Sequence, residues 1–126
     1  MGLLPETDRE YLASKGIIFE EVEKDGQKAV VLKDRPLPGE RFDTKIVDVL
    51  ILLPSGYPDV GPDMFYLLPW VKTVPANSFP KAADQPLDFF GKRWQRWSRH
   101  NNEWRSGIDG MRTMIKRVEH ALENAA

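Results

Sequence analysis

A cluster of tryptophans frames a short polar segment in the second half of the chain. Three of the four tryptophans belong to this cluster: Trp94, Trp97 and Trp104. Between them stand Ser98, Arg99 and His100, which offer a hydroxyl, a guanidinium and an imidazole. Because tryptophan buries a large apolar surface and also needs a partner for its indole N–H, the cluster predicts a structured, immobile platform. A platform that displays these three groups has the parts of a nucleophilic site.

The spacing of the three polar residues suggests how such a site would work. In an extended stretch, side chains two positions apart point to the same side, so Ser98 and His100 would meet. His100 would act as a general base for the Ser98 hydroxyl, worth about 10²–10⁴-fold, and Arg99 or backbone N–H groups would stabilise an oxyanion. Each of these residues also has a structural interpretation. Ser98 would be a turn or helix-cap hydroxyl, His100 would be a hydrogen-bonded structural histidine, and the tryptophans would be core or loop anchors.

Two aspartates in a turn rich in proline and glycine are further candidates. Asp59 and Asp63 both lie in the segment 54–63. If this turn approaches the tryptophan cluster, either carboxylate would orient His100 or an incoming lysine. Aspartates beside proline and glycine also commonly cap turns, so both interpretations stay open.

Composition places the chain among ordinary soluble proteins. Its 126 residues are 41% hydrophobic and 29% charged, with a net charge of −1. No apolar run approaches the roughly 20 residues of a membrane helix, and we expect one domain over residues 1–126. The start of the chain lacks the basic and apolar regions of a signal peptide, which predicts a cytoplasmic protein without a membrane partner.

Residue types argue against metal and cofactor chemistry. The chain has no cysteine, which excludes disulfides and thiolate ligands, and it has two histidines, His100 and His120. Zinc needs three or four ligands, and His120 has no second ligand beside it at helical spacing. Gly56 and Gly61 stand among prolines rather than at a helix start, so they do not form a phosphate-binding loop. We expect neither a metal nor a cofactor.

Charge is distributed unevenly along the chain. Residues 91–126 carry 8 Lys and Arg against 4 Asp and Glu, whereas residues 1–90 carry 10 against 15. These charges form either solvated faces or a basic surface for an acidic partner or a nucleic acid. The basic segment 92–105, with its interleaved tryptophans, would bind single-stranded nucleic acid by base stacking and phosphate contacts.

The first half of the chain predicts a helix followed by strands. A capping box at Thr7 predicts a short helix over 8–15, which Gly16 would end. Asp25-Gly26 suits a hairpin turn between strands over 17–22 and 28–33. The nearly continuous apolar run 46–53 predicts a central strand covered on both faces, and 64–68 predicts a fourth strand.

The second half predicts a long crossing and a final helix. Residues 69–93 contain several prolines and no sustained periodicity, so we expect an irregular segment. A helix is predicted over 107–123, because apolar residues recur there at three- and four-residue steps. Its predicted apolar stripe is Ile108, Met111, Ile115, Val118 and Leu122. The expected fold is therefore α+β, with a four-stranded antiparallel meander sheet between an N-terminal helix and a C-terminal helix packed on the sheet.

Three motifs in this order resemble the ubiquitin-conjugating enzyme superfamily. That superfamily joins two strands by a Tyr-Pro-x-x-Pro-Pro turn; here residues 57–62 read Tyr-Pro-Asp-Val-Gly-Pro, with glycine in place of one proline. Residues 94–100 (Trp-Gln-Arg-Trp-Ser-Arg-His) and 104–109 (Trp-Arg-Ser-Gly-Ile-Asp) follow. Together they make the chain similar to the bacterial branch called prokaryotic ubiquitin-conjugating-like family E, over about residues 5–123. The resemblance implies a ubiquitin-conjugating-enzyme-like fold.

The resemblance also implies a pathway and raises a question about chemistry. In the superfamily the catalytic cysteine stands about eight residues before a tryptophan; if that is Trp104, the position falls near 96–98, where no cysteine occurs. The superfamily's His-Pro-Asn motif is also missing from 69–93. The implied partners are a ubiquitin-like modifier, an activating enzyme and an isopeptidase of the same pathway.

Three functions therefore remain open, in order of preference. The first is transfer of the modifier to a target amine through an oxyester on Ser98, with His100 as base and Arg99 as electrostatic support. The second is a non-catalytic adaptor of the same fold that binds the modifier or the activating enzyme. The third is single-stranded nucleic-acid binding, ranked last because the fold already accounts for the tryptophan-rich segment.

Overall fold

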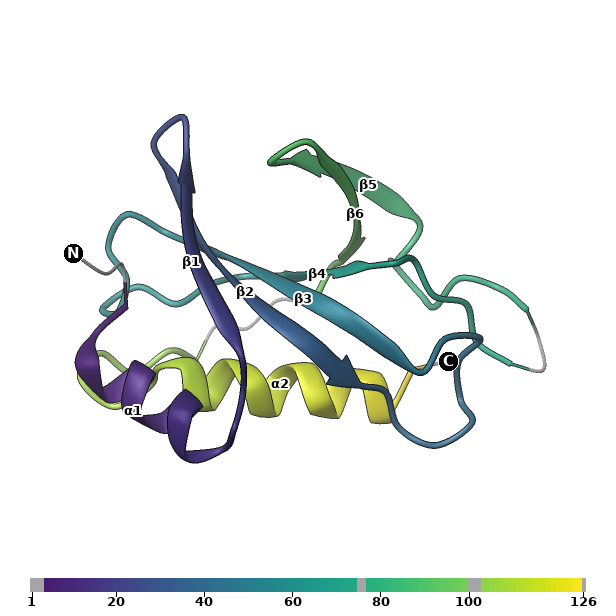
Figure 1. The fold of residues 1–126 in the computed structure, drawn as a ribbon, viewed down its shortest axis with the longest axis horizontal. Coiled ribbons are helices and arrows are strands. Elements are labelled where there is room, and N and C mark those ends of the chain that lie inside the picture. The colour runs from purple at the N-terminus through teal and green to yellow at the C-terminus, as the bar shows by residue number, and fades with distance from the viewer. Residues whose placement is uncertain (1–3, 75–76, 100–102, 126) are drawn as a thin grey trace.

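The fold is an antiparallel sheet with both helices on one face (Figure 1). The computed structural model describes residues 4–74, 77–99 and 103–125. Its elements are α1 (Glu6–Ser14), β1 (Phe19–Lys24), β2 (Gln27–Pro36), β3 (Ile46–Leu53), β4 (Phe65–Leu68), β5 (Gln85–Phe89), β6 (Lys92–Trp97) and α2 (Met111–Glu123). The strand order is β1-β2-β3-β4-β6-β5. The predicted α+β class is confirmed.

The first hairpin and the central strand form where the sequence predicts them. Asp25 and Gly26 make the β1–β2 turn with φ of 52° and 83°, the positive angles that such a two-residue turn requires. β3 spans the predicted apolar run and pairs with β2 on one side and β4 on the other. Because β3 is central and buried from both faces, its residues need no apolar–polar alternation.

The two helices cover one face of the sheet, but neither begins as predicted. α1 starts at Glu6 after Pro5 and has no side-chain cap, so the predicted Thr7 cap is wrong; Gly16, with φ of 67°, does follow the helix end. α2 starts at Met111, and Ile108 is 69% exposed rather than part of the stripe. The apolar face of α2 is buried against the sheet: Met111, Met114, Ile115, Val118 and Leu122.

The sheet has six strands in the described residues, so the prediction of four strands is wrong. The segment 69–93, predicted to be irregular throughout, contains β5 and the first residues of β6. Pro86 is tolerated because β5 is an edge strand, where one side needs no backbone donor. Phe90 and Gly91 form the turn with φ of 55° and 77°. Phenylalanine in this conformation is uncommon, which is why the turn escapes a composition-based prediction.

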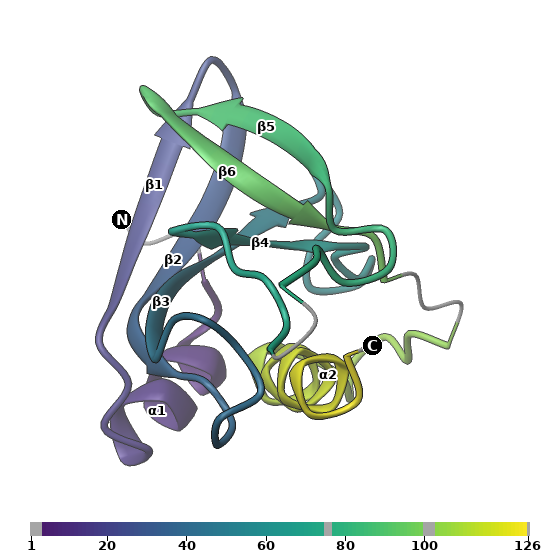
Figure 2. The same cartoon turned by 90° about the vertical axis from the view of Figure 1, so that its right-hand side faces the viewer.

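The β5–β6 hairpin curls over the face of the sheet opposite the helices (Figure 2). It brings Trp94, Leu87 and Phe89 against residues of β2 and β3, and this second apolar cluster includes Ala29 and Leu50. The sheet therefore has a core on each face, one under the helices and one under the hairpin. Neither helix of the described residues has the length and apolarity to cross a membrane.

Candidate functional site

The tryptophans of β6 are core anchors. Trp97 is fully buried, stacks on Phe65 with 5.4 Å between ring centroids, and meets Phe42 edge-on at 6.1 Å. Trp94 is 3% exposed on the other face of the sheet, and its Nε1–H donates to the Phe89 carbonyl at 3.3 Å. These rings fix β6 from both faces. They are also withdrawn from solvent, so they offer no surface on which nucleic-acid bases would stack.

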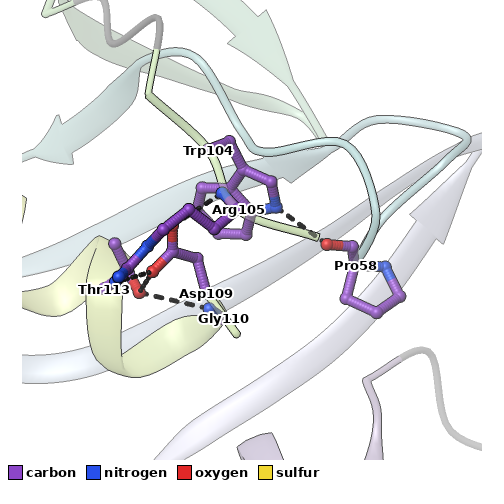
Figure 3. Close-up of polar contacts among 6 residues, drawn as sticks. All are labelled: Pro58, Trp104, Arg105, Asp109, Gly110 and Thr113. Atoms are coloured by element: carbon purple, nitrogen blue, oxygen red, sulfur yellow. Dashed lines mark hydrogen bonds and ion pairs between the residues drawn. The ribbon is translucent and has the colours of Figure 1, made fainter. Parts of the chain in front are cut away.

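Trp104 ties the turn after β3 to the loop before α2 (Figure 3). Its Nε1–H donates to the Pro58 carbonyl at 2.8 Å. Its ring lies so close to Gly61 that a Cβ added there would stand 2.3 Å from Trp104 Cδ2. The glycine in place of a family proline is therefore explained by the ring that packs on it.

Two aspartates accept further hydrogen bonds around the turn after β3 and the loop before α2. Asp8, buried at the start of α1, accepts hydrogen bonds from the Met111 N–H at 3.0 Å and from the Tyr57 hydroxyl. Asp109 accepts from the Arg105 N–H and guanidinium at 2.8 and 3.0 Å and from the Thr113 hydroxyl at 3.0 Å (Figure 3).

The surroundings of Asp109 and Tyr57 shift the pKa values of both side chains. The Arg105 side chain, helped by its backbone N–H and by Thr113, lowers the pKa of Asp109 from 3.8 to about 2. Burial, followed by the hydrogen bond to Asp8, raises the pKa of Tyr57 above its ordinary value. We call the set Asp8, Tyr57, Trp104 and Asp109 the junction; each member has a hydrogen-bond partner from another part of the chain or from the same loop.

A groove of about 790 Å³ opens between the end of β6 and α2. Ser98 and Arg99, directly after β6, line one side, and Asp63 and Phe65 line it at the start of β4. The other side is α2 with its C-cap residue, and the lining residues there are Met114, Lys116, Arg117, His120, Ala121 and Asn124. We call this cavity the basic groove.

The main chain of Ser98 is held from two directions. Its N–H donates to the Ala82 carbonyl at 3.1 Å, and its carbonyl accepts from Arg99 Nη1 at 3.0 Å. Arg99 Nη1 also donates to the Lys81 carbonyl at 2.9 Å, and the guanidinium lies 5.0 Å from the Trp97 ring centroid. Burial lowers the pKa of Arg99 from its ordinary value. The half-buried Ser98 is thus presented to the groove from a fixed backbone.

Arg117 brings a buried donor to the groove. Its guanidinium lies 5.3 Å from the Trp104 ring centroid, and Nη1 contacts Met114 Sδ at 3.7 Å. Nη2 is buried and has no hydrogen-bond partner among the described residues. Burial lowers the pKa of Arg117, an effect opposed by Asp109 and Asp63. His120, one turn further along α2, is exposed, and its Nδ1 lies 3.3 Å from the Asn124 amide nitrogen.

The structure gathers some of the predicted site residues and separates others. Ser98, Arg99 and Asp63 line the same groove. Asp59 does not; it accepts a hydrogen bond from the Ser106 hydroxyl at 2.6 Å and lines a different cavity beside α1. His100 lies outside the described residues.

Sequence reasoning missed the contribution of α2 to the groove. The helix supplies Lys116, Arg117, His120 and Asn124 to its wall. Lys116 and Arg117 stand four and three residues before His120, a spacing that places each of them beside His120 on the helix surface. That polar face was the available signal. Among the described residues, no group of three or more histidine or acidic side chains is arranged to hold a metal ion.

The fold and the motif order define a class of protein. An N-terminal helix, an open antiparallel sheet and a C-terminal helix, joined by the turn that Trp104 secures, are consistent with the fold of ubiquitin-conjugating-enzyme-like (E2-like) proteins. The chain belongs to prokaryotic E2 family E, whose model matches residues 4–125. Neither a curated protein nor a solved structure matches it significantly. The family supports a conjugating-enzyme-like role in a ubiquitin-like pathway, with a modifier and an activating enzyme as partners.

Proposed function

We propose that this protein accepts a ubiquitin-like modifier from an activating enzyme as an ester on Ser98 and passes it to a target amine. One observation carries the proposal: in a chain of this family without cysteine, Ser98 lines a groove together with Arg99 and His120. A hydroxyl, a cation and an imidazole are the groups that an acyl transfer needs. We further propose that the transfer takes place in the cytoplasm and that an isopeptidase reverses it.

The loading step exchanges a thioester for an ester. Ser98 Oγ attacks the carbonyl carbon of the modifier's C-terminal thioester on the activating enzyme, a C–O bond forms, and the C–S bond breaks to release the thiol. The Ser98 proton passes to a base, for which His100 is the candidate from the sequence and His120 the candidate that the groove adds. Arg99 stabilises the tetrahedral oxyanion.

The second step restores the serine. The target amine attacks the ester carbonyl, a C–N bond forms, the C–O bond breaks, and Ser98 Oγ takes a proton back. Asp63 in the groove accepts a hydrogen bond from the incoming amine or orients the base. Asp59, bonded to Ser106, serves the reaction indirectly by holding the turn that precedes Asp63.

Reconstitution with the activating enzyme, the modifier and ATP tests the proposal. The wild-type chain should form an adduct that hydroxylamine cleaves, because hydroxylamine attacks esters. Ser98→Ala should abolish this adduct, whereas Ser14→Ala, which removes an exposed hydroxyl at the end of α1, should retain it. Ser98→Cys should convert the adduct to a thioester that a thiol reductant cleaves. An adduct that persists in Ser98→Ala rules out this serine.

A non-catalytic adaptor is the second candidate, and the missing cysteine is the observation that favours it. An adaptor would bind the modifier or the activating enzyme through the same fold. It would show saturable binding to either partner while no covalent species forms under any loading condition. Loss of transfer to targets in Ser98→Ala with binding intact would exclude it.

A further inference from the structure

The basic groove carries more positive than negative charge on its walls. Arg99 stands on the β6 side, and Lys116 and Arg117 stand on α2, with the ionisable His120 one turn further on. Among the described residues that line the groove, Asp63 is the single carboxylate. The positive groups are spread along both walls rather than gathered at one point, so a single bound anion would contact only some of them.

Among these cations, Arg117 has a guanidinium that is partly withdrawn from water and held in place. Its Nη2 is buried without a hydrogen-bond partner among the described residues, which leaves a charged donor desolvated. A carboxylate that enters the groove would pair with the Lys116 and Arg117 cations that line it, and hydrogen bonds between ionised partners are the stronger kind. The guanidinium is already ordered against the Trp104 ring, so little side-chain entropy remains to be lost on binding.

The size and floor of the groove favour a polypeptide over a small ion. A volume of about 790 Å³ is within the range of sites for sizeable ligands. Phe65 and Met114, each 2% exposed, close the bottom of the groove, and the partly buried Ala121 lines it beside them. The aliphatic parts of an extended chain would pack on this apolar lining.

We propose that the basic groove binds an acidic segment of the protein that receives the modifier. The inference rests on the proposed function, because Ser98 lies in the same groove. A lysine amine that approaches this groove alone meets like charges on both walls. Aspartate or glutamate residues beside that lysine would pair with Lys116 and Arg117 and bring the amine to the ester. The groove therefore selects acceptor amines that have acidic neighbours.

Peptide binding to the full chain tests this without any transfer chemistry. Three short peptides with blocked ends and one central lysine are compared by calorimetric titration: flanking glutamates, flanking glutamines, and flanking lysines. The glutamate peptide should bind at least about tenfold more tightly than the glutamine peptide, a difference of about 1.4 kcal/mol. Its affinity should fall as salt is raised, because exposed charges are screened beyond about 10 Å at 0.1 M ionic strength.

Charge reversal inside and outside the groove provides matched variants. Lys116→Glu should weaken binding of the glutamate peptide about tenfold or more and remove its advantage over the glutamine peptide. Lys92→Glu makes the same charge change at the far end of β6 on another exposed residue, and it should leave binding within about twofold. Arg117→Met should weaken binding as Lys116→Glu does.

The inference falls if the glutamate and glutamine peptides bind equally, if none of the peptides binds, or if Lys116→Glu and Lys92→Glu behave alike. It also falls if a single-stranded oligonucleotide of equal charge binds more tightly with the same dependence on Lys116. A failure of the groove to prefer acidic peptides can be told apart from a failure of Ser98 to carry the modifier. Loss of acidic-peptide selectivity with a Ser98 adduct intact removes only the groove's preference, whereas an adduct on another residue removes the ester on Ser98.

Discussion

The junction and the basic groove meet where the Arg117 guanidinium lies 5.3 Å from the Trp104 ring centroid, and they treat polar groups differently. In the junction, Asp8 and Asp109 each accept hydrogen bonds from more than one donor, and the Trp104 indole has its own acceptor. In the groove, Arg117 keeps a buried nitrogen without a partner among the described residues. A satisfied network stabilises the fold, whereas the cations that line the groove are placed where an anionic ligand would pair with them.

This difference predicts separate consequences for mutation. Variants in the junction should lower the free energy of unfolding, and they should affect conjugation only through the folded fraction. Variants in the groove should leave the fold intact and change binding or transfer. A junction variant with unchanged stability, or a groove variant that unfolds, would contradict this division of roles.

The largest effect is expected for Asp8→Ala. The substitution leaves the buried Met111 N–H and the partly buried Tyr57 hydroxyl without their acceptor, at a cost of about 1–3 kcal/mol for the buried group and less for the hydroxyl. We expect the free energy of unfolding to fall by about 3 kcal/mol in urea denaturation. Asp84→Ala, at an exposed aspartate, is the control and should change it by less than about 0.5 kcal/mol. Similar losses in the two variants would contradict a stabilising role for the junction.

The next effect is a dependence of stability on pH that Asp109 produces. Its pKa is lowered from 3.8 to about 2 by Arg105 and Thr113, so the folded state favours the ionised form. The resulting stability is present above pH 3.8 and is lost as the pH falls towards 2. Melting temperatures measured through this range should fall less in Asp109→Asn than in the wild type. Parallel curves for the two proteins would show that Asp109 does not carry this linkage.

The smallest effect on stability is expected in the groove, for Arg117→Met. Methionine loses the partly buried cation–π contact with Trp104, worth about 0.5–2 kcal/mol. It also removes the cost of a desolvated nitrogen without a partner, so the two changes offset each other. The free energy of unfolding should change by less than about 1 kcal/mol, while transfer to targets declines. A loss as large as that of Asp8→Ala would place Arg117 among the structural residues.

Local patterns in the sequence predict most of the sheet and the final helix. The apolar run of β3 and the Asp25-Gly26 turn are local signals, and the structure matches both. The β5–β6 hairpin depends on long-range contacts instead. Gln95, fully buried in β6, bonds the backbone of Val71 and Ala83 and so satisfies a segment that forms no sheet of its own. No local pattern indicates that an amide side chain will do this.

Only the wall of the groove that follows β6 was predictable from the sequence. Ser98 and Arg99 are predicted by the tryptophan cluster, which encloses them, and by the family resemblance, which puts the superfamily's cysteine position near residues 96–98. The α2 wall was missed because Arg117 and His120 on a helix face look like solvated charges until the sheet end is placed beside them. Asp59 was predicted to orient His100 or an incoming lysine if its turn approached the tryptophan cluster, but it accepts a hydrogen bond from Ser106 and lines a different cavity.

Mapping the attachment residue of the modifier is the most direct test of the ester on Ser98. The full chain is loaded with modifier, activating enzyme and ATP, digested at acidic pH to preserve esters, and sequenced by tandem mass spectrometry. We expect the modifier's C-terminal residue on Ser98, and no such peptide without ATP. Attachment to a lysine or another hydroxyl, or transfer to targets without any adduct on this chain, would contradict the proposed mechanism.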